Sequence, residues 1–137
     1  MSLFNIFEIA GSGLTAQSVR MNATASNIAN AETVSSNSGD TYRAKIPLFS
    51  ALIEEQGKGY SAARVRVDGI VESQEPLRAQ YRPDHPMADA DGNIYLPNVN
   101  MVEEMANMIS ASRSYQTNIE VLNTSKQMLM RTLSLGE

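Results

Sequence analysis

The last third of the chain carries a heptad repeat, which constrains the fold more than any other feature. One row of residues spaced by seven comprises Met101, Met108, Tyr115, Leu122 and Leu129, and a second row, four residues further on, comprises Met105, Ser112, Ile119, Lys126 and Leu133. Eight of these ten positions are apolar, and such a repeat is typical of a long helix that packs on another helix. The pattern predicts a helix over residues 100–135.

Two signals predict where this helix begins and ends. Asn100 and Glu103 have the spacing of an N-terminal capping box, and Gly136 is the kind of residue that ends a helix. At a rise of about 1.5 Å per residue the helix would be about 54 Å long, which exceeds what a compact domain of this size needs.

The N-terminal region shows a similar repeat and predicts a helix over residues 3–31. Its main row is Phe7, Leu14, Met21 and Ile28, and a weaker row comprises Leu3, Ala10, Gln17, Thr24 and Ala31. Asn5 and Glu8 again have capping-box spacing. Gly11 and Gly13 would each cost about 1 kcal/mol inside a helix, so they indicate either a later helix start or a close approach of another backbone.

Both predicted helices are unusually poor in charge. Between Gly11 and Ala31 the only charged residue is Arg20, and between Met105 and Ser125 there are only Arg113 and Glu120. A helix on the surface of a globular protein normally turns a charged face toward water. We therefore expect both helices to be covered by protein on more than one side, including by neighbouring subunits.

The middle of the chain predicts a small β-rich insert. Residues 35–40 are a loop by composition, strands are expected within 42–53 and 64–71, and turns at 56–59 and 91–93. The predicted organisation is an N-terminal helix over 1–33, the insert over 34–97 and a C-terminal helix over 98–137. The predicted fold is mainly α, with the two terminal helices paired as an antiparallel coiled coil and a middle domain like a β-hairpin.

Composition and spacing argue against several classes of function. A net charge of −4 and a pI near 5.0 disfavour nucleic-acid binding, and no stretch is long enough for direct membrane insertion. The chain has no cysteine and one histidine, His85. The acidic cluster around Asp89 fails as a calcium loop because Asn100 stands at its twelfth position. We predict no catalytic residue, no cofactor and no metal, and we attribute the methionines to packing.

Three polar residues have roles that the pattern leaves open. Asn27 and Asn30 either cap the helix and form the following turn, or set the register between subunits as a buried asparagine does in coiled coils. Arg113 is an isolated positive charge. We expect it to be paired and partly buried, with Glu120 or with a carboxylate of a neighbour.

Several motifs resemble the axial proteins of the bacterial flagellum, which are its rod and hook subunits. The long segment before Tyr42 is most similar to proximal-rod subunits, and the resemblance is weakest between residues 48 and 83. The motifs are Ala25–Ala31 with Thr33, Tyr42–Lys45, Ala88–Gly92, Leu96–Val99, Met108–Gln116, Glu120–Thr124 and Thr132–Gly136.

The resemblance implies a subunit that polymerises through its terminal helices into the tubular drive shaft. We expect the residues of its assembly interface to be Phe7, Leu14, Met21, Asn27, Ile28, Asn30, Met101, Met105, Met108, Ser112, Arg113, Tyr115, Ile119, Leu122, Leu129 and Leu133. The resemblance also implies export by the flagellar type III system, without a cleaved signal peptide, to the rod in the periplasm. The implied partners are other copies of the chain, the rod proteins FlgB, FlgF and FlgG, the adaptor FliE and, during assembly, the rod cap FlgJ. Two alternatives are a helix-bundle adaptor that never polymerises and a wall-cutting hydrolase, but no convergent pair of carboxylates is readable.

Changing Leu122 to Asp would place a charge in the apolar stripe, which is costly unless the helix disengages. We expect Leu122→Asp to abolish rod assembly and motility while leaving secretion of the subunit intact, and Lys58→Ala to have little effect. Swimming assays and immunoblots of secreted protein measure both. Normal motility of the Leu122→Asp strain would contradict the assignment of this face.

Overall fold

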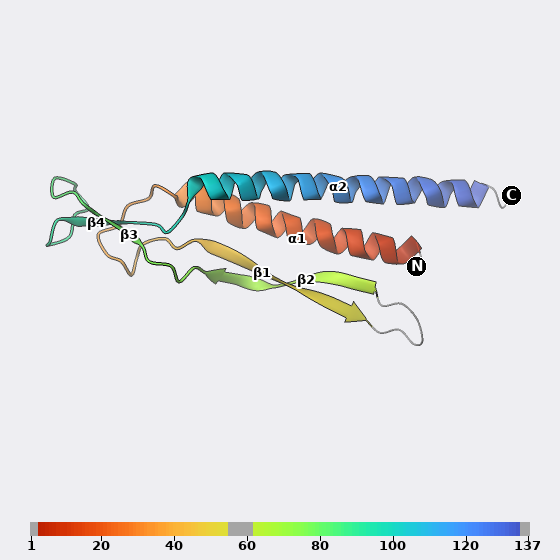
Figure 1. The fold of residues 1–137 in the computed structure, drawn as a ribbon, viewed down its shortest axis with the longest axis horizontal. Coiled ribbons are helices and arrows are strands. Elements are labelled where there is room, and N and C mark those ends of the chain that lie inside the picture. The colour runs from red at the N-terminus through yellow and green to blue at the C-terminus, as the bar shows by residue number, and fades with distance from the viewer. Residues whose placement is uncertain (1–2, 55–61, 135–137) are drawn as a thin grey trace.

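A computed structural model describes residues 3–54 and 62–134 and shows two long helices beside a small β-rich insert. Helix α1 (Leu3–Asn30) and helix α2 (Met101–Ser134) run antiparallel, and α2 packs against α1 along the whole length of α1 (Figure 1). Both predicted helices and the predicted antiparallel pairing are confirmed. The predicted stop at Gly136 lies outside the described residues.

The two predicted capping boxes have different outcomes. The Oδ1 atom of Asn100 accepts hydrogen bonds from the backbone N–H groups of Val102 at 3.2 Å and Glu103 at 3.4 Å, so Asn100 caps α2 as predicted. The cap predicted at Asn5 is wrong, because α1 already includes Leu3 and Asn5 lies within the helix.

The main part of the insert is a long antiparallel hairpin. Strand β1 (Lys45–Glu54) pairs with strand β2 (Ala62–Glu72), and a bulge interrupts the register where Leu48 and Phe49 face Gly69 and Val67. Both strands pack on α1, and α1 lies between the hairpin and α2 (Figure 1). Both strands fall where the sequence predicts them; the turn predicted at 56–59 lies outside the described residues.

A second, smaller sheet was not predicted. Strands β3 (Arg78–Tyr81) and β4 (Asn93–Leu96) pair at the end of the molecule far from the termini (Figure 1). The predicted turn at 91–93 directly precedes β4, and Gly92 adopts φ 78° there. The carboxylate of Asp89 accepts hydrogen bonds from the backbone N–H groups of Asn93 and Asp91, which lowers the pKa of Asp89 and fixes the loop.

The most deeply buried side chains of the two helices are small or polar rather than large and apolar. The side chains buried in α1 are Ala10, Ala16, Ala23, Thr24 and Asn27, and those buried in α2 are Ala111 and Ser125. The predicted large row of α2, from Met101 to Leu129, is half-buried. The second row of less exposed residues on α2 is Glu104, Ala111, Asn118 and Ser125, each three residues after a member of the large row. The prediction placed the second row four residues after the large row.

The two glycines of α1 lie in different surroundings. A Cβ atom at Gly13 would lie 2.9 Å from Nδ2 of Asn118 in α2, so the predicted close approach is real, although the neighbour is a side chain and not a backbone. At Gly11 no atom lies within 4 Å of such a Cβ. The helix runs through both positions, which excludes the alternative of a later start.

This difference predicts unequal effects of two alanine substitutions. Gly11→Ala should raise the free energy of unfolding of the isolated chain by about 0.5–1 kcal/mol, because alanine restricts the unfolded chain and nothing blocks its methyl group. Gly13→Ala should gain less, because the amide of Asn118 must move aside. Urea unfolding followed by circular dichroism measures both. A loss of stability in Gly11→Ala would contradict the observed surroundings.

Candidate assembly interface

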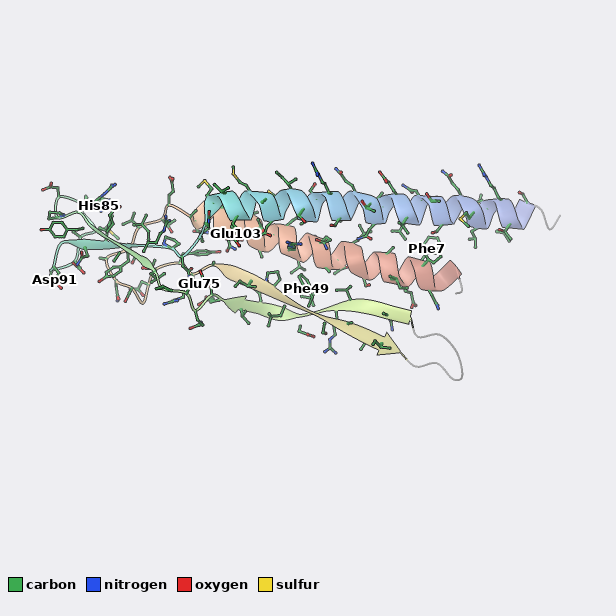
Figure 2. All side chains as sticks on the ribbon, viewed as in Figure 1. Phe7, Phe49, Glu75, His85, Asp91 and Glu103 are labelled. Carbon is green, nitrogen blue, oxygen red and sulfur yellow. The ribbon has the colours of Figure 1, made fainter. Side chains whose placement is uncertain are left out.

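One face of α2 carries large apolar side chains that no other described residue covers. Val102 is 77% exposed, Ile109 56% and Leu133 65%, and Met105 and Met130 are also more than half exposed. These five residues follow the alternating spacing of three and four on a face next to the seam with α1. Figure 2 shows side chains projecting from α2 on the side away from α1.

The residues predicted to form the assembly interface divide into three groups by burial. Those that are half-buried lie mostly along the contact between the two helices, and the exposed ones lie outside it. Phe7, Leu14, Met21, Ile28, Asn30, Met101, Met108, Ser112, Tyr115, Leu122 and Leu129 are half-buried; Met105, Arg113, Ile119 and Leu133 are exposed; Asn27 is buried.

Asn27 joins α1 to the start of the hairpin. Its Oδ1 atom accepts hydrogen bonds from the hydroxyl of Tyr42 at 2.9 Å and from the backbone N–H of Lys45 at 2.8 Å. Its Nδ2 atom donates to the carbonyl oxygen of Lys45 at 3.0 Å. This arrangement differs from the helix cap that the sequence left open as one of two roles. The network holds the insert to the helix.

The environment of Tyr42 keeps this network in place. Burial raises the pKa of the Tyr42 hydroxyl, and the negative charges of Glu104 and Glu72 raise it further. The hydroxyl therefore remains protonated and able to donate to Asn27.

Asn30 performs the local role that one of the two predictions gave it. Its Nδ2 atom donates to the carbonyl oxygen of Ser26 at 2.8 Å. Its own carbonyl oxygen accepts from the hydroxyl of Thr33 at 2.7 Å and from the backbone N–H of Thr33 at 3.1 Å. Asn30 and Thr33 thus end α1 and form the following turn.

The charged contact between the helices is not the predicted one. Arg113 is exposed, and within the described part of the chain it forms no ion pair, so the prediction that it is partly buried and pairs with Glu120 is wrong for the single chain. The contact is made instead by Arg20, which donates from a guanidinium nitrogen to Oδ1 of Asn107 in α2 at 2.9 Å. The isolation of Arg20 on a charge-poor helix was the signal that could have identified it.

The hairpin offers a further uncovered apolar surface. Ile46, Leu48, Ile53, Ile70 and Val71 are all substantially exposed although they belong to paired strands. A two-stranded sheet packed against a single helix leaves much of its side-chain surface open. The subunit therefore has uncovered apolar surface on both of its outer layers, α2 and the hairpin.

The described residues contain no group of three or more His, Cys, Asp or Glu side chains arranged to hold a metal ion. Among the helices of residues 3–54 and 62–134, none combines the length and the apolar character needed to cross a membrane.

Comparison with known proteins decides the family. A model of the flagella basal body rod protein matches residues 7–35, and a model of the C-terminal part of the flagellar basal body rod FlgEFG proteins matches residues 90–135. The flagellar basal-body rod protein FlgC of Salmonella typhimurium is 50% identical over 137 residues, which cover all of both chains. The chain belongs to the FlgC family. The FlgC proteins of Yersinia enterocolitica and of Buchnera aphidicola from Acyrthosiphon pisum are 49% and 43% identical, also over the full length of both chains.

Membership of the FlgC family confirms the resemblance seen in the sequence. It places the chain among the structural proteins of the flagellar basal-body rod. The two matched segments fall on α1 with the turn after it and on β4 with α2, so the family signature coincides with the helix pair.

The Asn27 network predicts a large effect of one substitution. Asn27→Ala should lower the free energy of unfolding by about 2 kcal/mol, because it removes a buried side chain and leaves partly buried backbone groups of Lys45 without partners. Asn30→Ala, which removes one local side-chain bond, should cost about 1 kcal/mol or less. Thermal or urea unfolding of both variants measures this difference, and equal losses would contradict the role given to Asn27.

Proposed function

We propose that the chain is a structural subunit of the proximal rod, and that it polymerises through α1 and α2 into the tubular drive shaft that transmits torque and encloses the export channel. The observation that carries this proposal is the uncovered apolar face of α2, together with family membership. The exposed apolar residues gather near the start of α2, at Val102, Met105 and Ile109, and near its end, at Met130 and Leu133. Exposed apolar groups that gather in this way mark contacts with other protein.

The architecture explains why the chain cannot cover this face by itself. The hairpin packs on α1 and not on α2, so α2 has α1 as its packing partner among the described elements. Burying apolar surface is worth roughly 25 cal/mol per Å², and several large side chains of α2 would gain this on contact with a neighbour. Met105, Ile119 and Leu133, which the sequence assigned to the interface, belong to this exposed surface.

The half-buried residues of the predicted interface contact neighbouring subunits through the part of each side chain that stays exposed. Residues such as Phe7, Leu14 and Tyr115 contribute part of their surface to the helix pair and present the rest outward. Arg113 is exposed, and in the assembly it is available to a carboxylate of a neighbouring subunit.

The proposed partners are other FlgC copies, the rod proteins FlgB, FlgF and FlgG, and the adaptor FliE, with the rod cap FlgJ acting during assembly. The proposed location is the part of the rod in the periplasm, reached through the flagellar type III system without a cleaved signal peptide. Met105 and Met130 on the exposed face support several unlike partners, because flexible methionine side chains adapt to non-identical surfaces.

The two alternatives from the sequence have less support. The uncovered face of α2 disfavours an adaptor that never polymerises. A family of structural rod proteins argues for a non-enzymatic role and against a wall-cutting hydrolase.

A matched pair of substitutions tests the exposed face. Ile109 and Ser110 are adjacent and both exposed, but they point about 100° apart around the helix. Ile109→Asp should abolish rod assembly and motility, because the charge would be buried in an apolar contact between subunits. Ser110→Asp introduces the same charge one face away and should retain motility.

Swimming assays and purification of basal bodies measure the outcome, and circular dichroism of the isolated variants checks folding. Because Ile109 is exposed, both variants should unfold within about 0.5 kcal/mol of the natural chain. Leu122 lies partly within the helix pair, so Leu122→Asp would disturb the subunit itself as well as its contacts. Normal motility of the Ile109→Asp strain would contradict the proposal.

A further inference from the structure

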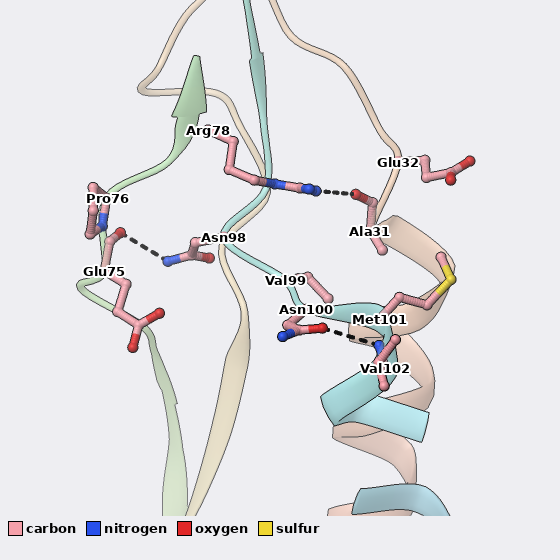
Figure 3. Close-up of a pocket in the computed structure, with 10 residues that line it drawn as sticks. All are labelled: Ala31, Glu32, Glu75, Pro76, Arg78, Asn98, Val99, Asn100, Met101 and Val102. Atoms are coloured by element: carbon pink, nitrogen blue, oxygen red, sulfur yellow. Dashed lines mark hydrogen bonds between the residues drawn. The ribbon is translucent and has the colours of Figure 1, made fainter. Parts of the chain in front are cut away.

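A hollow of about 580 Å³ lies where α1 ends, α2 begins and the insert leaves the helix pair (Figure 3). Its wall combines apolar groups with a few charged ones. It includes Pro76, Val99, Met101 and Val102 together with Glu32, Glu75 and Arg78. A volume of this size falls within the range of binding pockets in proteins.

The hydrogen bonds around the hollow hold its wall in shape. Arg78 donates to the carbonyl oxygens of Ala31 at 3.3 Å and Pro97 at 3.1 Å, which links the end of α1 to the approach to α2. Asn98 donates to the carbonyl oxygen of Glu75 at 3.0 Å (Figure 3). These contacts occupy the guanidinium of Arg78, whereas the carboxylates of Glu32 and Glu75 form no ion pair within the described chain.

The opposite end of the helix pair carries exposed apolar and basic side chains, which complement the apolar and acidic wall of the hollow. Counting ten residues outward from the contact between Gly13 and Asn118 places Leu3 opposite Met128, so the last turns of α2 project past α1 (Figure 1). Met128, Met130 and Leu133 are more than half exposed there. Lys126 and Arg131 are exposed on the same turns.

We propose that the hollow is the docking site for the C-terminal end of the long helix of the next rod subunit, stacked end to end along the shaft. This inference rests on the proposed function and specifies one of its contacts. Methionine and leucine side chains of the incoming helix end fill the space beside Val102 and Pro76, and its basic residues face Glu32 and Glu75.

Two further observations favour this occupant. The segment with α2 matches the model of the C-terminal part of the flagellar basal body rod FlgEFG proteins, so related rod proteins carry a comparable segment. The hollow and the projecting end lie at opposite ends of the helix pair (Figure 1), so the contact joins unlike surfaces. Contacts of this kind do not close on themselves in pairs but extend into a filament when the rotation leaves them open.

The test uses light-activated crosslinking in assembled rods. The photoreactive amino acid p-benzoylphenylalanine replaces Val102 in the full-length chain, basal bodies are purified and irradiated, and the crosslinked peptide is identified by mass spectrometry. The same probe in place of Ser110, which is exposed but outside the hollow, is the matched control. A reciprocal probe in place of Met130 covers the case in which the bulky group at Val102 prevents assembly.

The expected crosslink from position 102 joins a peptide from the last turns of the C-terminal helix of a rod subunit, and the Ser110 control lacks that product. The reciprocal probe at Met130 should join a peptide that includes the segment from 75 to 102 or its counterpart in a related rod protein. Products from positions 102 and 130 that map to other parts of a rod subunit, or no product in assembled rods, would overturn the docking and leave the proposed function standing. Absence of the chain from basal bodies would overturn the proposed function and the docking with it.

Discussion

The close packing of α1 on α2 through small side chains is the contact on which the rest of the subunit depends. Gly13 of α1 admits the amide of Asn118, and Ala111 of α2 is fully buried. Small residues let two helices approach closely, but each buries little apolar surface. The larger side chains are left at the sides of the seam or outside it, so the pairing that forms the subunit also leaves apolar surface for its neighbours.

The period of the sequence predicts the elements well and their contacts only in part. A repeat of seven residues requires a helix wherever it is sustained, and both helices are found. The repeat does not show which second row of α2 is buried beside the large row. Ala111, Asn118 and Ser125 are small or polar, so hydrophobicity alone does not mark them as buried. The prediction therefore chose Met105, Ile119 and Leu133 for their size, and these residues are exposed in the single chain.

Features that depend on residues far apart in the chain could not be predicted from the sequence pattern. Strands β3 and β4 are four residues each, and the residues of β3 are all exposed, so no alternation marks them. Asn27 looked like a capping residue because its partners, Tyr42 and Lys45, lie 15 and 18 residues further along. The hollow at the junction of three segments exists only after the chain has folded, and local pattern cannot indicate it.

The hairpin is fastened to α1 at two separated places. Asn27 holds its base, while further along Ser12 accepts a hydrogen bond from the backbone N–H of Val65 at 3.1 Å and Glu8 lies 3.6 Å from Arg64. Ser12 and Asn27 are about 22 Å apart along the helix. Two separate attachments fix both the position and the direction of the hairpin along α1, whereas a single attachment would let the hairpin rotate about it. The hairpin thus acts as a brace that stiffens α1 against sideways load.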